Sequence, residues 1–444
     1  MKRLILTVCI GLTTLLSASA QMQLTLDEAV QLALNENPTI RIANLEIQRY
    51  DYVRRETWGN WIPQIGVSGT YNRSVVKQEM AKGISFGADN TLTAQADATW
   101  ALFAPSIYQT LKLNKVQLAN AVESARASRI TLITDVKKAF YNILLTEQSL
   151  DVLRESEATV QRTVNDTKLQ YENGLTSEYD LLTAQVQLSN LRPTIIKTEN
   201  SIKVAKLMLK MYLSIPEDIT VDIIGKLDDL RDAVLTGVDA LTTDLTDNTS
   251  LRALDLQKQL LQRQLQLSNA SRIPTVIAFM NATLTGNDMD MSKFGILGGG
   301  STSLNSANGS NFWWQHPVSA GLKLSIPIFS GLTKMNRARQ IRNQITQVSL
   351  QRDYAQQQID VQVRSSINDL MTAREMMFAQ ELTVEQAEKA YAIAYTRYRA
   401  GAGTILELNS SQINMVQAQL SYSQSIYNYI SAKAEYDKII GKEE

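Results

Sequence analysis

The two halves of this chain repeat the same order of sequence features, and this duplication limits the folds that the chain can adopt. A shift of 211 positions aligns one set of residues, and a shift of 226 or 227 aligns a second set. Solenoid units span about 20 to 50 residues, so this repeat is too long to be one. We interpret it as a duplicated half that builds one symmetric object. The first shift pairs Asn37, Arg41, Leu45, Gln48, Ile62 and Pro63 with Asn248, Arg252, Leu256, Gln259, Ile273 and Pro274. The second pairs Phe103, Tyr171, Gly174, Leu181 and Gln185 with Phe329, Tyr398, Gly401, Leu408 and Gln412.

Residues 1–20 have the composition of a secretory signal peptide. Two basic residues precede an apolar segment over 4–16, and small residues at 18–20 form a cleavage site. The apolar segment is shorter than the ~20 residues that a membrane-spanning helix needs. The one cysteine, Cys9, lies in this segment, so the mature chain from Gln21 has no disulfide and no thiol for catalysis or lipid attachment. We expect an exported protein that is stabilised by packing or assembly.

The charge balance excludes some partners. The whole chain carries 44 basic and 44 acidic residues, and no basic patch stands out, so we do not expect nucleic acid as a partner. No later apolar run approaches ~20 residues, so we expect no membrane-spanning helix. Insertion into a membrane would then require a β-barrel.

Four segments alternate between apolar and polar residues with the period of a β-strand. They cover about 64–74, 91–103, 275–285 and 318–329. Each is about ten residues long, which is the length that a tilted strand needs to cross a bilayer. The apolar face suits membrane lipid, and a polar face that includes Asp97 and Lys323 suits a water-filled lumen. The alternative is that these are four amphipathic strands of a soluble sheet.

The five tryptophans favour the membrane interpretation. Trp58, Trp61, Trp100, Trp313 and Trp314 all lie beside expected strand ends, as in the aromatic girdles of membrane barrels. Ordinary packing is the alternative explanation. The smallest membrane barrels have about eight strands, so four strands from one chain cannot close. Three chains together would supply twelve.

Two very long helices are predicted, one in each half. Residues 106–171 contain no proline and no glycine, so at ~1.5 Å per residue they form a helix of about 100 Å. The second half has a counterpart over 332–398. Apolar residues recur at spacings of three, four and seven, as in a coiled-coil seam. Such helices must pack along their length as an extended bundle or tube, and shorter helices return over 177–213 and 404–440.

The predicted fold is a mixed architecture of an α-helical tube and a transmembrane β-barrel. The mature chain divides into a first repeat over 21–213, an equatorial inter-repeat packing element over 214–238 and a second repeat over 239–444. Each repeat holds a strand pair and a helical hairpin. The loop 286–317 is richer in Gly, Ser and Asn than its counterpart 77–90, so we expect it to be an exposed insertion.

The sequence contains no constellation of catalytic residues. It has no nucleophile elbow, no P-loop and no His/Cys metal cluster. The one histidine, His316, lies in the predicted outer loop, where a solvated side chain is expected. The segment Asp288 to Met291 suggests a cation or soft-metal site, but two carboxylates in a polar loop are usually solvated. We therefore expect no enzyme activity, no cofactor and no metal.

The turns after the two long helices are more informative. Gly174 and Gly401 fit the C-terminal helix position that requires a positive φ. Asp180 and Glu407 follow them, each at capping-box spacing from a Ser or Thr, so each acid has a structural explanation as a helix cap. This explanation is compatible with a second one. Three Glu407 carboxylates around a narrow axis would favour cations and repel anions.

The order and spacing of these features resemble the TolC family of outer-membrane channel proteins. The resemblance covers the whole mature chain: the duplicated halves, the strand pairs, Pro63 and Pro274 at strand entry, Phe103 and Phe329 at strand exit, and the glycine turns. It implies a homotrimer with a twelve-stranded barrel in the outer membrane and a twelve-helix tube through much of the periplasm. It also implies that the helical tips dock a periplasmic adaptor.

The resemblance assigns roles to residues at these tips. Where family members hold the entrance shut, an acid after the first tip bonds to a tyrosine and an arginine of the second. Asp180 and Tyr398 occupy the matching positions, whereas the arginine position is Gly403, so that ionic latch is absent or differently made. Glu407 matches one acid of the inner ring of the family, and the next member of the ring is Ser410. The residues expected to dock the adaptor are Gly174, Leu175, Thr176, Gly401, Ala402 and Gly403.

These features predict a passive trimeric outer-membrane channel for efflux or secretion. Its energy would come from an inner-membrane pump that is joined to it through the adaptor. One alternative is a non-transporting trimeric coiled-coil surface protein or adhesin. The returning helices and duplicated strand pairs argue against it, because a single-pass stalk needs neither. A second alternative is an exported enzyme, which the missing site chemistry disfavours.

Overall fold

The computed structural model describes residues 22–76, 78–81, 84–86, 88–231, 241–288 and 312–443. The predicted signal peptide lies outside these residues. Contacts divide the chain into two compact units. The hairpin unit comprises Met1–Glu46, Val122–Ala253 and Arg352–Glu444, and the sheet unit comprises Ile47–Ala121 and Leu254–Gln351. Each unit therefore takes segments from both sequence repeats, so the repeats are not separate compact bodies.

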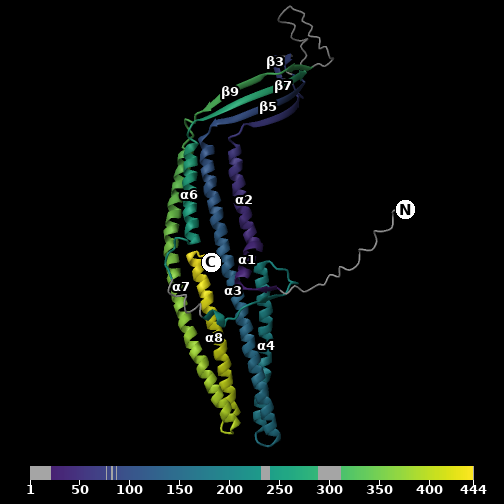
Figure 1. Ribbon diagram of the computed structural model, residues 1–444. Helices are drawn as coiled ribbons and strands as arrows, with labels where there is room; N and C mark the ends of the chain where they lie inside the picture. Colours follow the sequence, from purple (N-terminus) through teal and green to yellow (C-terminus); the bar gives the residue numbers. More distant parts are fainter. Residues whose placement is uncertain are drawn as a thin grey trace, which may run out of the picture. The chain divides into compact units, whose positions relative to one another are not determined.

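The sheet unit is built on an antiparallel sheet with four strand positions (Figure 1). β2 (Gln64–Arg73) pairs with β5 (Asn90–Phe103), and β5 pairs with β7 (Thr275–Asp288). The fourth position is shared by β8 (Phe312–Gln315) and β9 (Val318–Ser325), which pair with successive parts of β7. The predicted strand pairs of the two halves thus meet side by side at β5 and β7.

The fourth strand differs in detail from the prediction of 318–329. It begins at Phe312 and is interrupted at His316 and Pro317, where proline has no N–H to donate to the ladder. The Pro317 carbonyl still accepts from the Thr283 N–H at 3.0 Å. The strand ends at Ser325, before the next proline, Pro327. In the segment expected to be a polar loop, residues 78–81 and 84–86 form a short hairpin, β3 and β4.

The strand register places similar side chains on the same face of the sheet. One row across the four strands is apolar and consists of Ile65, Ala98, Met280 and Ala320. The neighbouring row points to the other face and consists of Gly66, Asp97, Asn281 and Ser319. The predicted separation of an apolar face from a polar face is confirmed.

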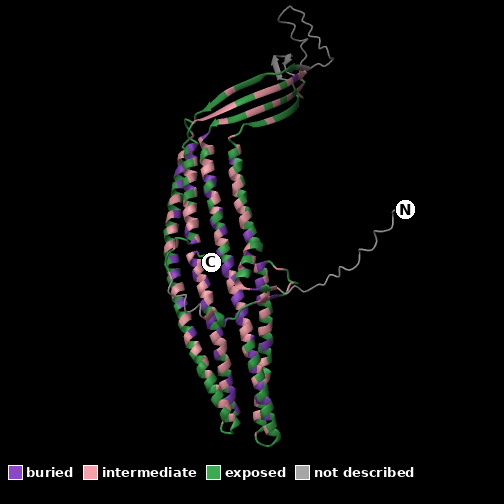
Figure 2. Cartoon of the chain, in the orientation of Figure 1, coloured by how far each residue is buried: buried purple, intermediate pink, exposed green. Residues whose placement is uncertain are grey.

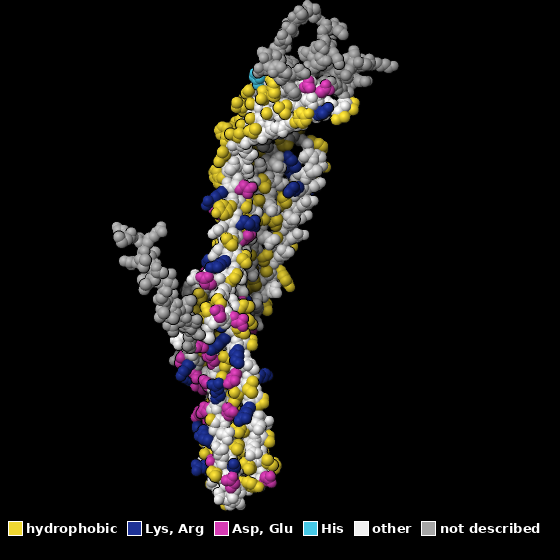
Figure 3. All heavy atoms as spheres, turned by 90° about the vertical axis from the view of Figure 1, so that its right-hand side faces the viewer, with side chains coloured by type: hydrophobic (Ala, Val, Ile, Leu, Met, Phe, Trp, Pro, Cys, Tyr) yellow, Lys and Arg dark blue, Asp and Glu magenta, His cyan; other side chains and the backbone are white. Residues whose placement is uncertain are grey.

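Both faces of the sheet are accessible in a single chain. Val67 is 81% exposed and Leu322 is 69% exposed, and the strands are almost entirely exposed or intermediate in Figure 2. Hydrophobic side chains are frequent on the visible surface of the sheet in Figure 3. Large apolar side chains in water are unfavourable by about 1.5–3 kcal/mol each, so this face requires a covering.

Two helices lead into the sheet, one in each half. α2 (Pro38–Gly59) precedes β2, and α6 (Thr249–Ala270) precedes β7. A proline, Pro63 or Pro274, lies directly before the strand in each case, where its fixed φ prevents the helix from continuing. Within the sheet unit, the Asn114 Nδ2 donates to Thr57 Oγ1 at 2.6 Å.

Two long helical hairpins lie mostly in the hairpin unit. In the first, α3 (Pro105–Glu172) reverses into α4 (Glu178–Leu213), and in the second, α7 (Thr333–Arg399) reverses into α8 (Ile405–Ile440) (Figure 1). The hairpin unit holds α3 from Val122 and α7 from Arg352 onward. Each end of the four helices lies within one residue of the predicted bound.

Shorter elements join the start of the mature chain to the inter-repeat segment. β1 (Met22–Leu24) pairs in parallel with β6 (Val221–Ile223), and η1 (Asp228–Leu230) follows. α1 (Leu26–Glu36) begins with a capping box between Thr25 and Glu28. The pairing of β1 with β6 was not predicted. Each strand has only three residues, which is too short to show the alternation of apolar and polar residues that identifies a strand.

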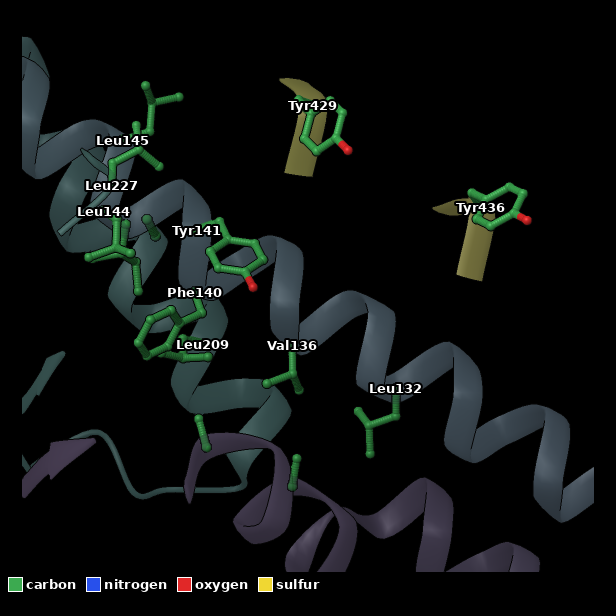
Figure 4. Packing of buried hydrophobic residues seen from close by; sticks show 14 of the residues in the cluster. Leu132, Val136, Phe140, Tyr141, Leu144, Leu145, Leu209, Leu227, Tyr429 and Tyr436 are labelled. Atoms are coloured by element: carbon green, nitrogen blue, oxygen red, sulfur yellow. The ribbon is translucent and has the colours of Figure 1, made fainter. Parts of the chain in front are cut away.

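Apolar side chains from several helices form the main core of the hairpin unit. Phe140 of α3 and Leu209 of α4 point toward one another in Figure 4, and both are buried. Tyr436 of α8 is also buried, and its hydroxyl oxygen lies 2.7 Å from both the N and the O of Thr242. The inter-repeat segment is thereby tied to the last helix.

The most conspicuous repeated residue, asparagine at 37 and 248, has the same role in both halves. The Asn37 side-chain oxygen accepts a backbone N–H at the start of α2 at 2.8 Å, and its Nδ2 donates to Tyr212 O at 2.8 Å. The Asn248 oxygen accepts a backbone N–H at the start of α6 at 3.0 Å, and its Nδ2 donates to Ile439 O at 2.7 Å. Each asparagine therefore joins the start of one helix to the end of the return helix.

Candidate functional site

The candidate site consists of the two turns that connect the hairpins. We call residues 173–177 the first tip and residues 400–404 the second tip. At the first tip, Gly174 has φ 72° and its N–H donates to Tyr171 O at 2.9 Å, while Leu175 N–H donates to Gln170 O at 2.8 Å. This pair of bonds is a Schellman motif. A side chain at Gly174 would meet no atom within 4 Å, so the positive φ, and not lack of space, selects glycine.

Asp180 serves as a helix cap at the first tip. Its Oδ2 accepts from the hydroxyls of Thr176 at 2.8 Å and Ser177 at 2.9 Å, and from the Ser177 N–H at 3.4 Å. Its own N–H donates to Ser177 Oγ at 3.2 Å. The predicted capping box is therefore confirmed.

These bonds favour the ionised form of Asp180. The hydrogen bond from the Thr176 hydroxyl lowers the Asp180 pKa below its ordinary value of 3.8. Partial burial opposes this shift, and the bonds from Ser177 add to it. A carboxylate whose pKa is lowered by folding stabilises the folded state when the pH is above its unfolded pKa. This stabilisation is lost as the pH falls through the folded pKa. The cap is therefore intact at neutral pH and weakens only in strong acid.

The second tip repeats this turn with a different support. Gly401 has φ 70°, its N–H donates to Tyr398 O at 3.0 Å, and Ala402 N–H donates to Arg397 O at 2.9 Å. The Arg397 guanidinium reaches back to Ala402 O at 3.2 Å. This arginine braces its own turn, whereas at the first tip the Asn173 Nδ2 donates to Leu169 O at 2.7 Å.

Glu407 caps the helix that follows the second tip. Its N–H donates to Thr404 Oγ1 at 3.2 Å, and its Oε2 accepts from the Thr404 N–H at 3.4 Å. A Cβ at Gly403 would lie 3.2 Å from Tyr398 N and 3.3 Å from Glu407 Oε2. A side chain at position 403 would therefore be in tight contact with the turn.

Tyr398 does not bond to Asp180. Its hydroxyl lies 2.8 Å from Thr167 Oγ1, and among the described residues Asp180 bonds only to Thr176 and Ser177. Burial raises the Tyr398 pKa, the bond to Thr167 opposes this, and the charges of Asp180 and Asp166 add to the rise. Asp180 is thus near enough to act on Tyr398 electrostatically. The hydrogen bond expected between them is absent, and Tyr398 bonds to Thr167 instead.

Thr167 was missed by the sequence analysis. It is a threonine in the last two turns of a long helix, with 0% of its surface exposed, and it belongs to no motif. Its partner lies 231 positions along the chain, so no spacing rule connects the two. A coiled-coil pattern identifies it at most as a core-facing residue.

The other predicted candidates have structural surroundings. His316 is exposed between β8 and β9. The Asp288 Oδ2 accepts from Asn90 Nδ2 at 2.8 Å, and Asn90 Oδ1 accepts from the Tyr71 hydroxyl at 2.8 Å. This chain of bonds ties β2, β5 and β7 together at one end. Residues 289–291 of the suggested cation site lie outside the described residues.

Two further surveys cover the part of the chain that the structure describes. None of its helices combines the length and the apolar character needed to cross a bilayer. No group of three or more His, Cys, Asp or Glu side chains in it could hold a metal ion.

The fold is that of outer-membrane channels. The structure of CusC superposes with a TM-score of 0.73 at 15% identity, covering 94% of this chain and 92% of that one. VceC from Vibrio cholerae superposes with a TM-score of 0.71 at 15% identity, covering 94% and 96%. The outer membrane protein TolC of Escherichia coli is 22% identical over 448 residues, which cover 99% of this chain and 87% of TolC.

The sequence also matches the family of outer membrane efflux proteins, over residues 29–213 and 241–442. The chain belongs to this family. It is an efflux channel of the outer membrane, and the predicted fold class and location are confirmed.

Proposed function

We propose that three copies of this chain form one passive conduit through the outer membrane. The observation that carries this proposal is the four-stranded sheet. Among the described strands, β2 and the β8/β9 strand each pair on one side only, and the apolar face is exposed. The smallest membrane barrels have about eight strands, so one chain cannot close the sheet, whereas three chains supply twelve. The polar face with Asp97 and Lys323 would then line the lumen.

The tips are proposed to dock a periplasmic adaptor that joins the channel to an inner-membrane pump. They present the turn residues Gly174, Leu175, Thr176, Gly401, Ala402 and Gly403. Leu175 is 78% exposed, and an exposed large apolar side chain at a turn suits a protein contact. The sequence has no nucleotide motif, so the energy for transport would come from the pump.

The entrance gate is proposed to lie just behind these tips, at Asp180, Tyr398 and Glu407. Asp180 and Glu407 act as caps in the single chain, and a cap leaves one face of the carboxylate free to contribute to the field at the entrance. In a trimer, the three Glu407 side chains would place three negative charges around the axis.

Oligomeric state and conductance test the conduit together. We expect the detergent-extracted protein to have the mass of a trimer by light scattering, and the trimer to conduct ions when it is reconstituted into planar bilayers. A monomer would rule out the pooled barrel. If a trimer forms without conductance, and surface protease cleaves the long helices on intact cells, the adhesin alternative is favoured instead.

Glu407→Gln is expected to weaken the cation selectivity of the conduit. Residues 408–432 contain no charged residue, so Glu407 is the one charge in the first seven turns of α8. Neutralising it removes the negative ring while keeping side-chain size. The measurement is the reversal potential under a salt gradient, with Glu178→Gln as control because it removes an equal charge from the first tip. A reversal potential that is unchanged in Glu407→Gln would leave Glu407 as a cap alone.

A further inference from the structure

The contact between the two hairpins near their tips is made by uncharged groups. The Thr167 hydroxyl on α3 and the Tyr398 hydroxyl on α7 are 2.8 Å apart. Thr167 lies seven residues before Gly174, and Tyr398 lies three residues before Gly401. A second bond between the hairpins, from Gln412 Nε2 to Ser156 O, is farther from the tips and longer, at 3.4 Å.

The charged groups near this contact bond elsewhere. The Asp180 carboxylate is held by Thr176 and Ser177, and the Arg397 guanidinium bonds to the carbonyl of its own turn. Asp166 and Arg399 line a groove of about 260 Å³ beside Tyr398, and Asp166 acts on Tyr398 only through its charge. Among the described residues, the ion pairs Lys168–Glu172 and Arg192–Glu157 near the first tip both lie within the first hairpin.

The same contact is surrounded by apolar side chains from both hairpins. Tyr398 packs against a cluster whose buried members are Val160, Val164, Ala184, Ile405 and Leu408. Because Thr167 is fully buried, water cannot replace its partner without opening this cluster. A buried hydroxyl that loses its partner is unfavourable, so the hydrogen bond and the packing must break together when the hairpins separate.

We propose that the Thr167–Tyr398 hydrogen bond is the latch that holds the two tips together, and that Thr167 is a positioning residue of the entrance. The inference rests on the proposed conduit and names the regulation of its gate. Salt screens ionic contacts but not a bond between two neutral hydroxyls. The strength of this latch is therefore independent of ionic strength, unlike that of an ion pair.

The test is hydrogen exchange at both tips of the full detergent-solubilised protein, combined with open probability in bilayers. Thr167→Val and Tyr398→Phe are each expected to raise tip exchange and the ratio of open to closed channels about fivefold, the effect of one net hydrogen bond. The double variant is expected to open no more than either single variant, since both substitutions remove the same bond and no unpartnered hydroxyl remains. Tip exchange in the unsubstituted protein is expected to be equal in low and high salt.

Thr163→Val is the matched control. Thr163 lies one turn earlier on α3 and is 4% exposed, but its hydroxyl bonds to Thr159 O of its own helix at 3.2 Å. Equal behaviour of Thr167→Val and Thr163→Val, additive effects in the double variant, or salt-dependent tip exchange would overturn the latch. Hydrogen exchange is measured independently of conductance, so it tests the hydrogen bond separately from the conduit. A protein that does not conduct, yet loosens at the tips in Thr167→Val alone, would refute the conduit and support the bond.

Discussion

Replacing Gly441 by alanine is expected to destabilise the hairpin unit by about 3 kcal/mol. Gly441 ends α8 with φ 81°, and a Cβ there would lie 2.0 Å from Asp247 O and 3.1 Å from Arg126 Nη2. The first atom is backbone and cannot move aside, so the end of α8 must separate from the segment before α6. The measurement is the melting temperature of the solubilised protein by circular dichroism.

Two other positions distinguish the effect of backbone strain at Gly441 from the effect of the steric clash. Gly401→Ala introduces the same left-handed strain at φ 70°, but its Cβ would meet no atom within 4 Å, so a loss of about 1 kcal/mol is expected. Ser214, the repeat counterpart of Gly441, already adopts φ 57° with a side chain. Equal melting temperatures for Gly441→Ala and Gly401→Ala would show that the Asp247 contact does not constrain this end of the chain.

Arg126→Ala is expected to cost about 3 kcal/mol, because Arg126 connects three segments at once. Its guanidinium bonds to Glu123 at 2.6 Å and to Glu443 at 2.8 Å, and it donates to the backbone carbonyls of Asp247 at 2.9 Å and Gly441 at 2.8 Å. Removing it leaves two carbonyls and two carboxylates without this partner. The Glu123 side chain is only 12% exposed, so water compensates poorly for the lost charge.

Arg154→Ala provides the comparison for Arg126→Ala. Arg154 also lies on α3, but it makes one ion pair, with Glu199 at 2.9 Å, and its side chain is 57% exposed. Exposed pairs of this kind contribute about 0–1 kcal/mol. Chemical denaturation of both variants should therefore show a large loss for Arg126→Ala and a small one for Arg154→Ala. Similar losses would mean that Arg126 acts as an ordinary surface arginine.

The helices, strands and turns could be predicted because their signals are local. Alternation within ten residues assigned the apolar and polar faces that the register of β2, β5, β7 and β9 then showed. The fourth strand was predicted to begin at 318, where β9 begins, but it ends at Ser325 and not at 329, and β8 on the other side of Pro317 was not predicted. The pairing of β1 with β6 was also missed, because it joins residues about 200 positions apart.

The tip residues show the same division between local and distant interactions. Gly174 and Gly401 were predicted to have positive φ, and Asp180 and Glu407 were predicted as caps, because a turn and a cap involve residues three or four positions apart. The partner of Tyr398 was not predictable in this way. Asp180 and Thr167 are both within reach of the second hairpin, and only the folded arrangement shows which one bonds to Tyr398.

The duplication alone determined that this chain has two equivalent halves, each with a strand pair and a helical hairpin. It did not show why certain residues recur. The structure shows that Asn37 and Asn248 each join a helix start to the end of a return helix, at Tyr212 O and Ile439 O. It also shows where the halves differ, since the cap at Ser214 accepts a side chain and the one at Gly441 does not. Periodicity reports the local backbone, whereas these contacts depend on groups nearly 200 residues away that only folding brings together.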